Sequence, residues 1–344
     1  MKIIRKIIAV FFLFHLFAVS ESWDGFDKIL RSTKYIVNRC FDTIHDMICD
    51  NTECCTDNWI KANFSNLSIA LTSSLHGQHL VKQILLPSIR GHLIDNDPKK
   101  ALVLSFHGGT GVGKNFVTRL IAENLYAQGM ESKYVHLFIT TRDFKFDNEL
   151  NEYKRNLELK IYSSVASCES SLFIFDETDM MPTELINVMK PYVDNYNDID
   201  GINFRRAIFI FLNNIGSEAI ENLTHRVWEE DRKRIDITLK DMEPLIVTDL
   251  KTKEATNVKV GLYKSSIMEN HLIDTFVPFL PLEKEHVKLC IKDDLNSKGH
   301  AVDPKVIEEI ADELNYFPEG TTKFSKFGCR RISQKVNMKL VDEL

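Results

Sequence analysis

The sequence predicts an α/β fold in which a parallel sheet is covered by helices on both faces, followed by a smaller helical domain. Two observations carry this prediction. Between residues 101 and 230, short apolar runs alternate with longer helix-compatible segments. Continuous apolar strands separated by helices are typical of a parallel sheet that is buried on both sides. After residue 283, three helical segments follow one another without intervening strands, which indicates the smaller domain.

The individual elements are predicted from residue type and from turn signals. β-Branched and aromatic residues mark the strands, and the helix after the first strand stops near Gly129, as glycine often follows a helix end. The strands are expected at 101–106, 134–139, 172–176 and 207–212, and the helices after them at 115–128, 148–164, 183–194 and 217–230. Residues 241–263 are predicted to form a short hairpin and 276–282 a rigid apolar strip, with the later helices at 283–297, 304–315 and 327–339. The order of the strands in the sheet is not predicted.

The N-terminal segment is typical of a secretory leader. Three basic residues among the first six precede the apolar stretch 7–19, and residues 18–20 resemble a small-residue cleavage site. The apolar stretch is short for a membrane span, and an uncleaved anchor is the alternative interpretation. The chain ends in Val-Asp-Glu-Leu at 341–344, which matches an endoplasmic reticulum retrieval signal at three of four positions. Together the two ends predict the lumen of the endoplasmic reticulum.

Composition excludes one class of partner and predicts two modifications. The formal net charge of −6 gives no basic surface for nucleic acid. The chain has seven cysteines, so in a disulfide-permissive compartment at least one is unpaired or pairs between chains. N-glycosylation sequons begin at Asn63, Asn66 and Asn222.

A glycine-rich loop directly after the first predicted strand indicates a phosphate-binding site. The loop consists of Gly108, Gly109, Thr110, Gly111, Val112, Gly113, Lys114 and Asn115. In the pattern G-x-x-x-x-G-K-[ST], backbone N–H groups and a helix N-terminus cradle phosphates while the lysine reaches the outer ones. Asn115 replaces the hydroxyl residue that contributes to Mg²⁺ binding, so Mg²⁺ is expected to be held through the Asn amide oxygen or through water. A glycine-rich turn without a ligand is the alternative interpretation.

Two carboxylates at the end of a later apolar strand complete the pattern of a nucleoside triphosphatase. Asp176 and Glu177 follow the run 171–175, about sixty residues after Lys114. Asp176 is expected to orient Mg²⁺ through its water shell, and Glu177 to act as general base on the attacking water. By itself an Asp-Glu pair could also cap the next helix. The phosphate loop makes the ATPase interpretation the better one.

Two further polar residues are candidates for sensing the nucleotide. Asn214 follows the strand 207–212, where it is expected to lie beside the loop and hold the attacking water or the γ-phosphate. Arg330 opens the last predicted helix, from which a cation could fold over the nucleotide. Asn214 could instead be a turn residue, and Arg330 a solvated helix residue. A secreted kinase fits less well, because Asp176, Glu177 and Asn214 suit a water nucleophile.

These residues resemble the signatures of the torsin family, AAA+ ATPases of the endoplasmic reticulum and nuclear-envelope lumen that are related to the Clp/Hsp100 disaggregases. The resemblance rests on Gly108–Asn115, Ile174-Phe175-Asp176-Glu177, Phe211–Gly216 and Gly328-Cys329-Arg330, with support from 77–79, 134–138 and 276–282. It extends from about Cys49 to Lys339. It implies a P-loop AAA+ fold, with a signal peptide at 1–20, a Cys-rich segment at 21–58, a large nucleotide-binding domain at 59–275 and a small helical lid domain at 276–344.

The resemblance also assigns roles to individual residues. It implies ATP bound at Gly108–Asn115, with Lys114 on the phosphates. It makes Asp176 and Glu177 the Walker B pair, Asn214 sensor 1 and Arg330 sensor 2. The family usually has Lys at this last position. The implied disulfides are Cys49–Cys168 and Cys290–Cys329, which leave Cys40, Cys54 and Cys55 over.

The resemblance implies an ATPase that depends on an activator, because torsins lack an arginine finger of their own. The implied activator is the AAA+-like lumenal domain of a membrane protein of the lamina-associated polypeptide type. ATP and Mg²⁺ are the implied cofactors, and remodelling of protein or membrane-associated complexes is the implied function. A homo-oligomer and peripheral membrane association are left open. The alternative function is a nucleotide-dependent scaffold or regulatory binding module with little turnover.

Overall fold

The computed structural model describes residues 49–252, 261–262 and 265–342. The expected leader at 1–20, Cys40 and the last two residues of the expected retrieval signal lie outside this part. The chain divides into two compact units, Met1–Cys54 and Cys55–Leu344. In the described part of the first unit, Cys49 forms a disulfide with Cys54. All elements described below belong to the second unit.

A parallel sheet forms the centre of the second unit, as predicted. Over the described residues it has five strands in the order β2-β3-β4-β1-β5. Their bounds are β1 Leu102–His107, β2 Val135–Ile139, β3 Leu172–Asp176, β4 Ile208–Asn213 and β5 Thr275–Pro278. The first four match the predicted strands to within one residue. Because β1 lies between β4 and β5 and leads into the phosphate loop, the loop emerges from the interior of the sheet.

The fifth strand comes from the segment that was predicted to be a rigid apolar strip. Phe276 and Val277 pair in parallel register with Ser105 and Phe106 of β1. The boundary expected between residues 275 and 276 therefore falls inside β5. Pro278 ends the strand, and the chain then runs on toward the smaller domain.

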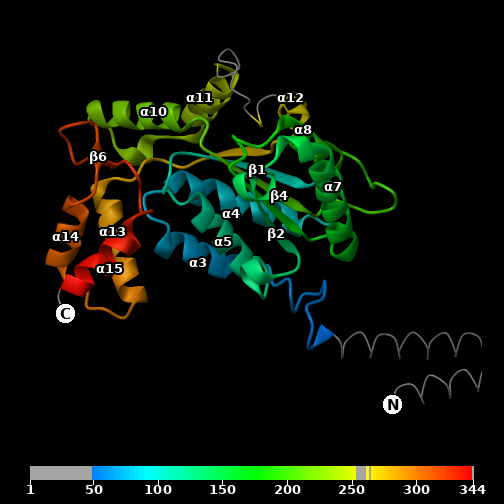
Figure 1. The fold of residues 1–344 in the computed structure, drawn as a ribbon, viewed down its shortest axis with the longest axis horizontal. Helices are drawn as coiled ribbons and strands as arrows, with labels where there is room; N and C mark the ends of the chain where they lie inside the picture. The colour runs from blue at the N-terminus through cyan, green and yellow to red at the C-terminus, as the bar shows by residue number, and fades with distance from the viewer. Residues whose placement is uncertain (1–48, 253–260, 263–264, 343–344) are drawn as a thin grey trace, which may run out of the picture. The chain divides into compact units, whose positions relative to one another are not determined.

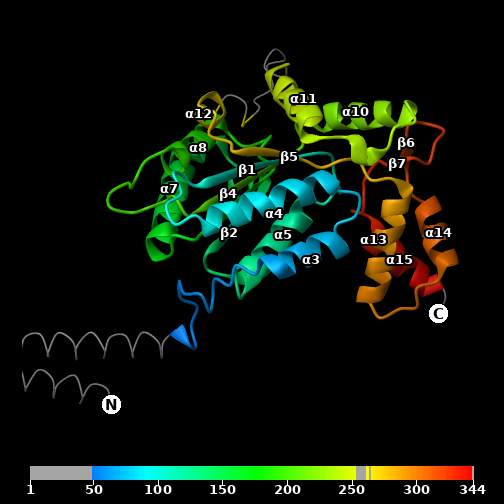
Figure 2. The same ribbon diagram turned by 180° about the vertical axis from the view of Figure 1, so that it is seen from behind.

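Alternating side chains of the strands fill two separate cores, one on each face of the sheet. On one face, Leu104 and Phe106 pack in the cluster that includes α3, α4 and α5 residues. On the other, Val103, Phe173 and Phe209 pack in the cluster that includes α7 and α8 residues. Figures 1 and 2 show these two groups of helices on opposite sides of the sheet. Burial on both faces explains why the strands are apolar throughout.

The four helices predicted between residues 115 and 230 are present with shifted ends, and further helices lie outside the predicted segments. Their bounds are α3 Phe64–Ser74, α4 His79–Ile94, α5 Lys114–Leu125, α6 Thr140–Asp143, α7 Leu150–Ser167, α8 Thr183–Val188, α9 Lys190–Val193, α10 Ser217–Glu229, α11 Leu239–Thr252 and α12 Ser266–Glu269. Short 3₁₀ turns lie at Gly129–Glu131, Asp147–Glu149 and Arg234–Asp236. The helix predicted at 183–194 is divided into α8 and α9, and Pro191 lies in the first turn of α9.

The segment 241–263, predicted to form a hairpin, is helical in its first half, because α11 covers residues 241–252; residues 253–260 and 263–264 lie outside the described residues. Met242, Ile246 and Leu250 are all fully buried and belong to one apolar cluster with residues of α10 and β5. Their spacing of four residues places them on one helix face. The scattered β-branched residues concealed this helical stripe.

The smaller domain, called the lid below, comprises residues 282–342. Its elements are α13 Lys284–Ser297, α14 Pro304–Asp312, β6 Tyr316–Phe317, β7 Phe324–Ser325 and α15 Ile332–Asp342. Val287, Ile291, Ile310 and Val336 form part of its own apolar core. The last helix begins five residues later than predicted, so Arg330 lies in the turn that precedes it.

One implied disulfide is present and the other is wrong. Cys290 of α13 is bonded to Cys329, as the resemblance implied. Cys168, however, is bonded to Cys55, with 5.3 Å between their Cα atoms, and Cys49 takes its partner five residues away at Cys54. Cys54 and Cys55 are therefore not left over. Sequence spacing could not decide which of the crowded cysteines would meet the end of α7.

Candidate functional site

The register of the sheet brings the predicted site residues to one edge. His107 of β1 lies opposite Asn213 of β4, and Phe175 of β3 lies opposite Phe211 of β4. The next residues along each strand are Gly108, Asn214 and Asp176. The carboxyl ends of parallel strands face the same edge, where ligands bind in open α/β sheets.

Two glycines of the phosphate loop are required by close backbone approaches. Gly108 has φ +151°, and a Cβ there would lie 2.6 Å from the carbonyl oxygen of Phe279. Gly111 has φ +75°, and a Cβ there would lie 2.0 Å from the carbonyl oxygen of Phe327 in the lid. A side chain at either position would force the loop away from its neighbour. The loop is therefore packed against the chain after β5 and against the lid.

Lys114, the first residue of α5, is held by acceptors of the loop and of the neighbouring strand. Its Nζ donates to the carbonyl oxygens of Gly108 at 2.5 Å and Gly109 at 2.8 Å, and to Oδ1 of Asn214 at 3.0 Å. Burial lowers the pKa of Lys114 to about 8, against the opposing effect of the nearby Asp176 and Asp179 carboxylates. Phosphate oxygens would restore the solvation that burial removes.

Asn115 contacts the carboxylate that was predicted to orient Mg²⁺. Its Nδ2 donates to Oδ2 of Asp176 at 2.7 Å. The amide thus takes a hydrogen bond that a Ser or Thr hydroxyl could make, while its own oxygen stays free of that contact. An Asp carboxylate and an Asn amide oxygen are ligands that Mg²⁺ accepts, usually with water and substrate phosphates completing its shell. Asn115 and Asp176 therefore fit the Mg²⁺ of an Mg·ATP substrate.

Glu177 is held by a residue that sequence reasoning missed. Its Oε2 accepts hydrogen bonds from the backbone N–H of Thr141 at 3.2 Å and from the Thr141 hydroxyl at 2.5 Å. Glu177 has φ +57°, a left-handed conformation that is uncommon for a non-glycine residue. The backbone after β3 thus turns sharply, and this turn brings the Glu177 carboxylate to Thr141 in the first turn of α6.

Asn214 lies between the lysine and another missed carboxylate. Its Oδ1 accepts from Lys114, and its Nδ2 donates to Oδ2 of Asp179 at 3.4 Å. The backbone just after Asn214 is held by buried His107, whose Nδ1 bonds to the carbonyl oxygen of Ile215 at 2.9 Å. Burial lowers the pKa of His107 to about 4, so this ring is neutral at physiological pH. Asp179, three residues after Asp176, had no sequence pattern of its own.

The predicted residues border one cavity of about 730 Å³ between the strand ends and the lid. Gly109 to Asn115, Asp176, Glu177, Asn214 and Arg330 all line it. Gly108 contributes through its carbonyl bond to Lys114. Arg330 is exposed and reaches the cavity from the lid side. His76 and the Cys290–Cys329 disulfide also line it, and no sequence pattern pointed to His76.

The predicted glycosylation sites are at the surface or at a helix end. Asn66 and Asn222 are exposed. Asn63 is partly buried and caps α3, where its side chain accepts from the backbone N–H of Asn66 at 3.0 Å. Attachment of a glycan at any of the three stays a prediction.

Fold and site together define the class of protein: an α/β AAA+ ATPase with a helical lid over the phosphate loop. Comparison with known proteins agrees with this class and narrows it. The family model described as Torsin matches residues 49–175, and that described as Torsin-1A, C-terminal domain, matches residues 282–338. A torsin-like protein of Caenorhabditis elegans is 38% identical over 84% of this chain and 80% of its own length. Torsin-3A of Rattus norvegicus is 35% identical over 88% of this chain and 76% of its own length. The chain belongs to the torsin family.

A solved structure supports the fold independently. The Hsp104–ADP complex of Saccharomyces cerevisiae matches 82% of this chain with a TM-score of 0.59 and 13% identity. The match covers 48% of Hsp104, so this chain spans about half the length of that protein. At this identity the similarity shows a shared AAA+ fold.

The described residues contain neither a membrane-spanning helix nor a cluster of metal-ligating side chains. Within 49–252, 261–262 and 265–342, no helix combines the length and hydropathy needed to cross a membrane. In the same part of the chain, no group of three or more His, Cys, Asp or Glu side chains is placed to hold a metal ion. Mg²⁺ is usually held by one or two carboxylates together with substrate phosphates, which does not require such a group.

Proposed function

We propose that this torsin binds Mg·ATP in the cavity and hydrolyses it with the help of an activator, to remodel protein or membrane-associated complexes. The observation that carries the proposal is the convergence of Lys114, Asp176, Glu177 and Asn214 on one cavity that Arg330 enters from the lid. Each of these side chains has a function in phosphoryl transfer to water.

The chemistry assigned to each residue follows from its position. Lys114 neutralises the outer phosphates. Asp176 and Asn115 hold the Mg²⁺ that accompanies ATP, and Asn214 positions the γ-phosphate or the attacking water. Glu177 takes the proton of that water as it attacks phosphorus. Arg330 contacts the phosphates when the lid is closed.

The need for an activator is supported by the charges around the cavity. Lys114 and Arg330 are the lysine and arginine side chains that line it within the described residues. A second arginine supplied in trans is worth roughly 10³–10⁵ in turnover for phosphoryl transfer. We propose the AAA+-like lumenal domain of a lamina-associated polypeptide-type membrane protein as its source, in the lumen of the endoplasmic reticulum and nuclear envelope.

One observation favours the alternative of an ATP-dependent binding module with little turnover. The carboxylate of Glu177 is engaged by two donors of Thr141 rather than being directed freely into the cavity. In that arrangement ATP would hold a partner complex together, and hydrolysis would release it only when Glu177 is freed.

The substitution Glu177→Gln tests the proposal. It removes the base but keeps the shape, so ATP affinity should be retained while activator-stimulated turnover falls roughly 100-fold or more. Binding is measured by calorimetry, turnover by phosphate release, and partner capture by pull-down. Glu184→Gln, at an exposed site in α8, is the matched control. Equal turnover by wild type and Glu177→Gln would refute the ATPase mechanism. Rapid hydrolysis by wild type alone would refute the need for an activator.

A further inference from the structure

We propose that Gln78 is a positioning residue that couples the position of the lid to the geometry of the phosphate loop. The inference rests on the proposed function, because it assumes that the loop binds the phosphates of ATP. It assigns a function to a buried side chain that lies outside the cavity.

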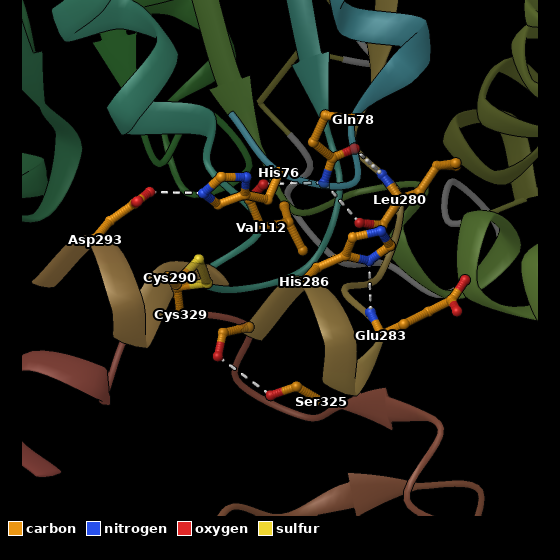
Figure 3. Close-up of a disulfide and its surroundings, with 11 residues drawn as sticks. His76, Gln78, Val112, Leu280, Glu283, His286, Cys290, Asp293, Ser325 and Cys329 are labelled. Atoms are coloured by element: carbon orange, nitrogen blue, oxygen red, sulfur yellow. Dashed lines mark hydrogen bonds and ion pairs between the residues drawn. A yellow bond between two sulfur atoms is a disulfide. The ribbon is translucent and has the colours of Figure 1, made fainter. Parts of the chain in front are cut away.

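Gln78 makes three hydrogen bonds to two separate backbone segments. Its Nε2 donates to the carbonyl oxygen of Val112 in the phosphate loop at 3.0 Å and to that of Leu280 at 2.8 Å. Its Oε1 accepts from the N–H of Leu280 at 2.8 Å. Figure 3 shows the side chain pointing between the two segments. Gln78 is buried at 1% exposure, so losing any of these bonds would leave a buried polar group unsatisfied.

Leu280 lies in the connection between the sheet and the lid. β5 ends at Pro278, and α13 of the lid begins at Lys284. Any rotation of the lid about this connection must move the backbone near Leu280. Through Gln78, that displacement is transmitted to Val112.

The loop has a second, direct bond to the lid next to the first. The N–H of Cys329 donates to the carbonyl oxygen of Gly111 at 3.0 Å. Of two consecutive loop carbonyls, that of residue 111 is thus bonded to the lid itself, and that of residue 112 to the side chain that holds the connection. The loop therefore has its present geometry only while the lid and its connection stay in place.

Arg234 also ties the connection to the segment that contains Gln78. Arg234 donates to the carbonyl oxygen of Gly77 at 3.0 and 2.7 Å and to that of Pro281 at 2.8 Å. These bonds hold the neighbours of Gln78 and Leu280 together without touching the loop. Among Gly77, Gln78, Leu280, Pro281 and Arg234, it is Gln78 that bonds to the phosphate loop, through the Val112 carbonyl.

Only an amide satisfies this arrangement, because the site requires donors and an acceptor on one planar group. Gln78→Met keeps the length and loses all three bonds. Gln78→Glu keeps the acceptor for the Leu280 N–H but faces two carbonyl oxygens with a carboxylate. Both variants should disconnect the loop from the lid, whereas Gln83→Met, at an exposed position of α4, should not.

The lid contains a contact that can report its position. The ring of Trp228 on α10 packs edge-on against Phe324 of β7, with 6.2 Å between the ring centroids. In a full chain with Trp23 and Trp59 replaced by Phe, Trp228 fluorescence therefore follows the lid relative to α10. ATP affinity is measured by calorimetry on the same proteins, and urea unfolding without nucleotide measures their stability.

We expect Gln78→Met and Gln78→Glu to weaken ATP binding by 10- to 100-fold. At ATP concentrations that saturate each variant, the Trp228 response should fall below a quarter of that of the parent. A residue that only stabilises the fold would leave this saturated response intact. Wild-type ATP affinity and a full response in both variants would overturn the inference, as would a parent protein whose Trp228 does not respond to ATP.

If the variants do not fold, hydrogen exchange on the unsubstituted chain tests the coupling between the lid and the phosphate loop. Bound ATP should slow exchange of the Leu280 amide, whose partner is Gln78. Unchanged exchange there at saturating ATP overturns the coupling and leaves the ATPase intact. If the unsubstituted chain does not bind ATP at all, the proposed function fails, and the inference fails with it.

Discussion

The two sides of the nucleotide cavity are built in different ways. The floor, defined as Lys114, Asn115, Asp176, Glu177 and Asn214, consists of side chains at the start of α5 and after β3 and β4 that hydrogen-bond within the large domain. The lid side presents one exposed arginine to the cavity, Arg330, and contacts the large domain through groups such as the Cys329 N–H and the Asp293 carboxylate, which bonds to His76. The floor is therefore organised before a ligand arrives, whereas the lid side depends on how two domains meet. The predictions below test this difference.

The contact between the phosphate loop and the lid should be the most sensitive to substitution. Gly111→Ala combines a left-handed φ of +75° with a Cβ that would lie 2.0 Å from the Phe327 carbonyl. We expect a loss of about 3 kcal/mol in the free energy of unfolding, from strain and forced separation, and a marked loss of ATP affinity.

Gly320→Ala is the matched control for this prediction. It has φ +81°, but its Cβ would meet no atom within 4 Å. Strain alone should then cost about 1 kcal/mol. Urea unfolding measures both variants, and equal losses would show that the approach of lid and loop does not constrain position 111.

Lys114 of the floor should make the affinity for ATP depend on pH. Burial lowers the pKa of free Lys114 to about 8, and bound phosphates favour the charged amine and raise that pKa. Binding therefore takes up a proton above pH 8, and ATP affinity should fall by up to tenfold per pH unit as the pH rises beyond it. Calorimetry between pH 7 and pH 9.5 measures this.

Lys114→Arg tests whether that decline belongs to Lys114, because a guanidinium stays charged throughout this range. Its ATP affinity, whatever its value at pH 7, should stay constant up to pH 9.5. A decline as steep as that of the wild type would assign the titration to another group.

The smallest effect is expected from the contact between Thr141 and the carboxylate of Glu177. Thr141→Val removes the hydroxyl that donates to Glu177 and leaves the backbone N–H contact in place. A carboxylate released from the hydroxyl is freer to contact water, so basal phosphate release should rise about two- to fivefold. Thr141→Ser retains the hydroxyl and should behave as wild type. A lower rate in Thr141→Val would mean that Thr141 holds Glu177 in its working position.

The floor was predictable because its residues follow buried strands at fixed positions. Once Lys114, Asp176 and Asn214 were each placed after an apolar run, the geometry of a parallel sheet required them to meet. Thr141 and Asp179 were missed because a single Thr or Asp after a strand is common in turns. Their function depends on where the chain bends at Glu177, which a residue pattern does not reveal.

Elsewhere the errors share one cause. The helix α11 was taken for a hairpin because β-branched residues masked the spacing of Met242, Ile246 and Leu250, which is decided by the surface they cover. The disulfide partner of Cys168 was misplaced because several cysteines compete within a few residues. In both cases local preference was weaker than tertiary contact.

The sequence alone determined the sheet, the phosphate loop with its carboxylate pair, and membership of the torsin family. These features are predictable because the types of residues close together in the sequence determine strand burial, loop chemistry and helix starts. The tertiary structure decided the place of β5, the partners of Cys55 and Cys49, and the joining of Gln78 to both Val112 and Leu280. Those contacts link residues far apart in the chain, and their energy depends on exact distances between backbones that only the folded protein sets.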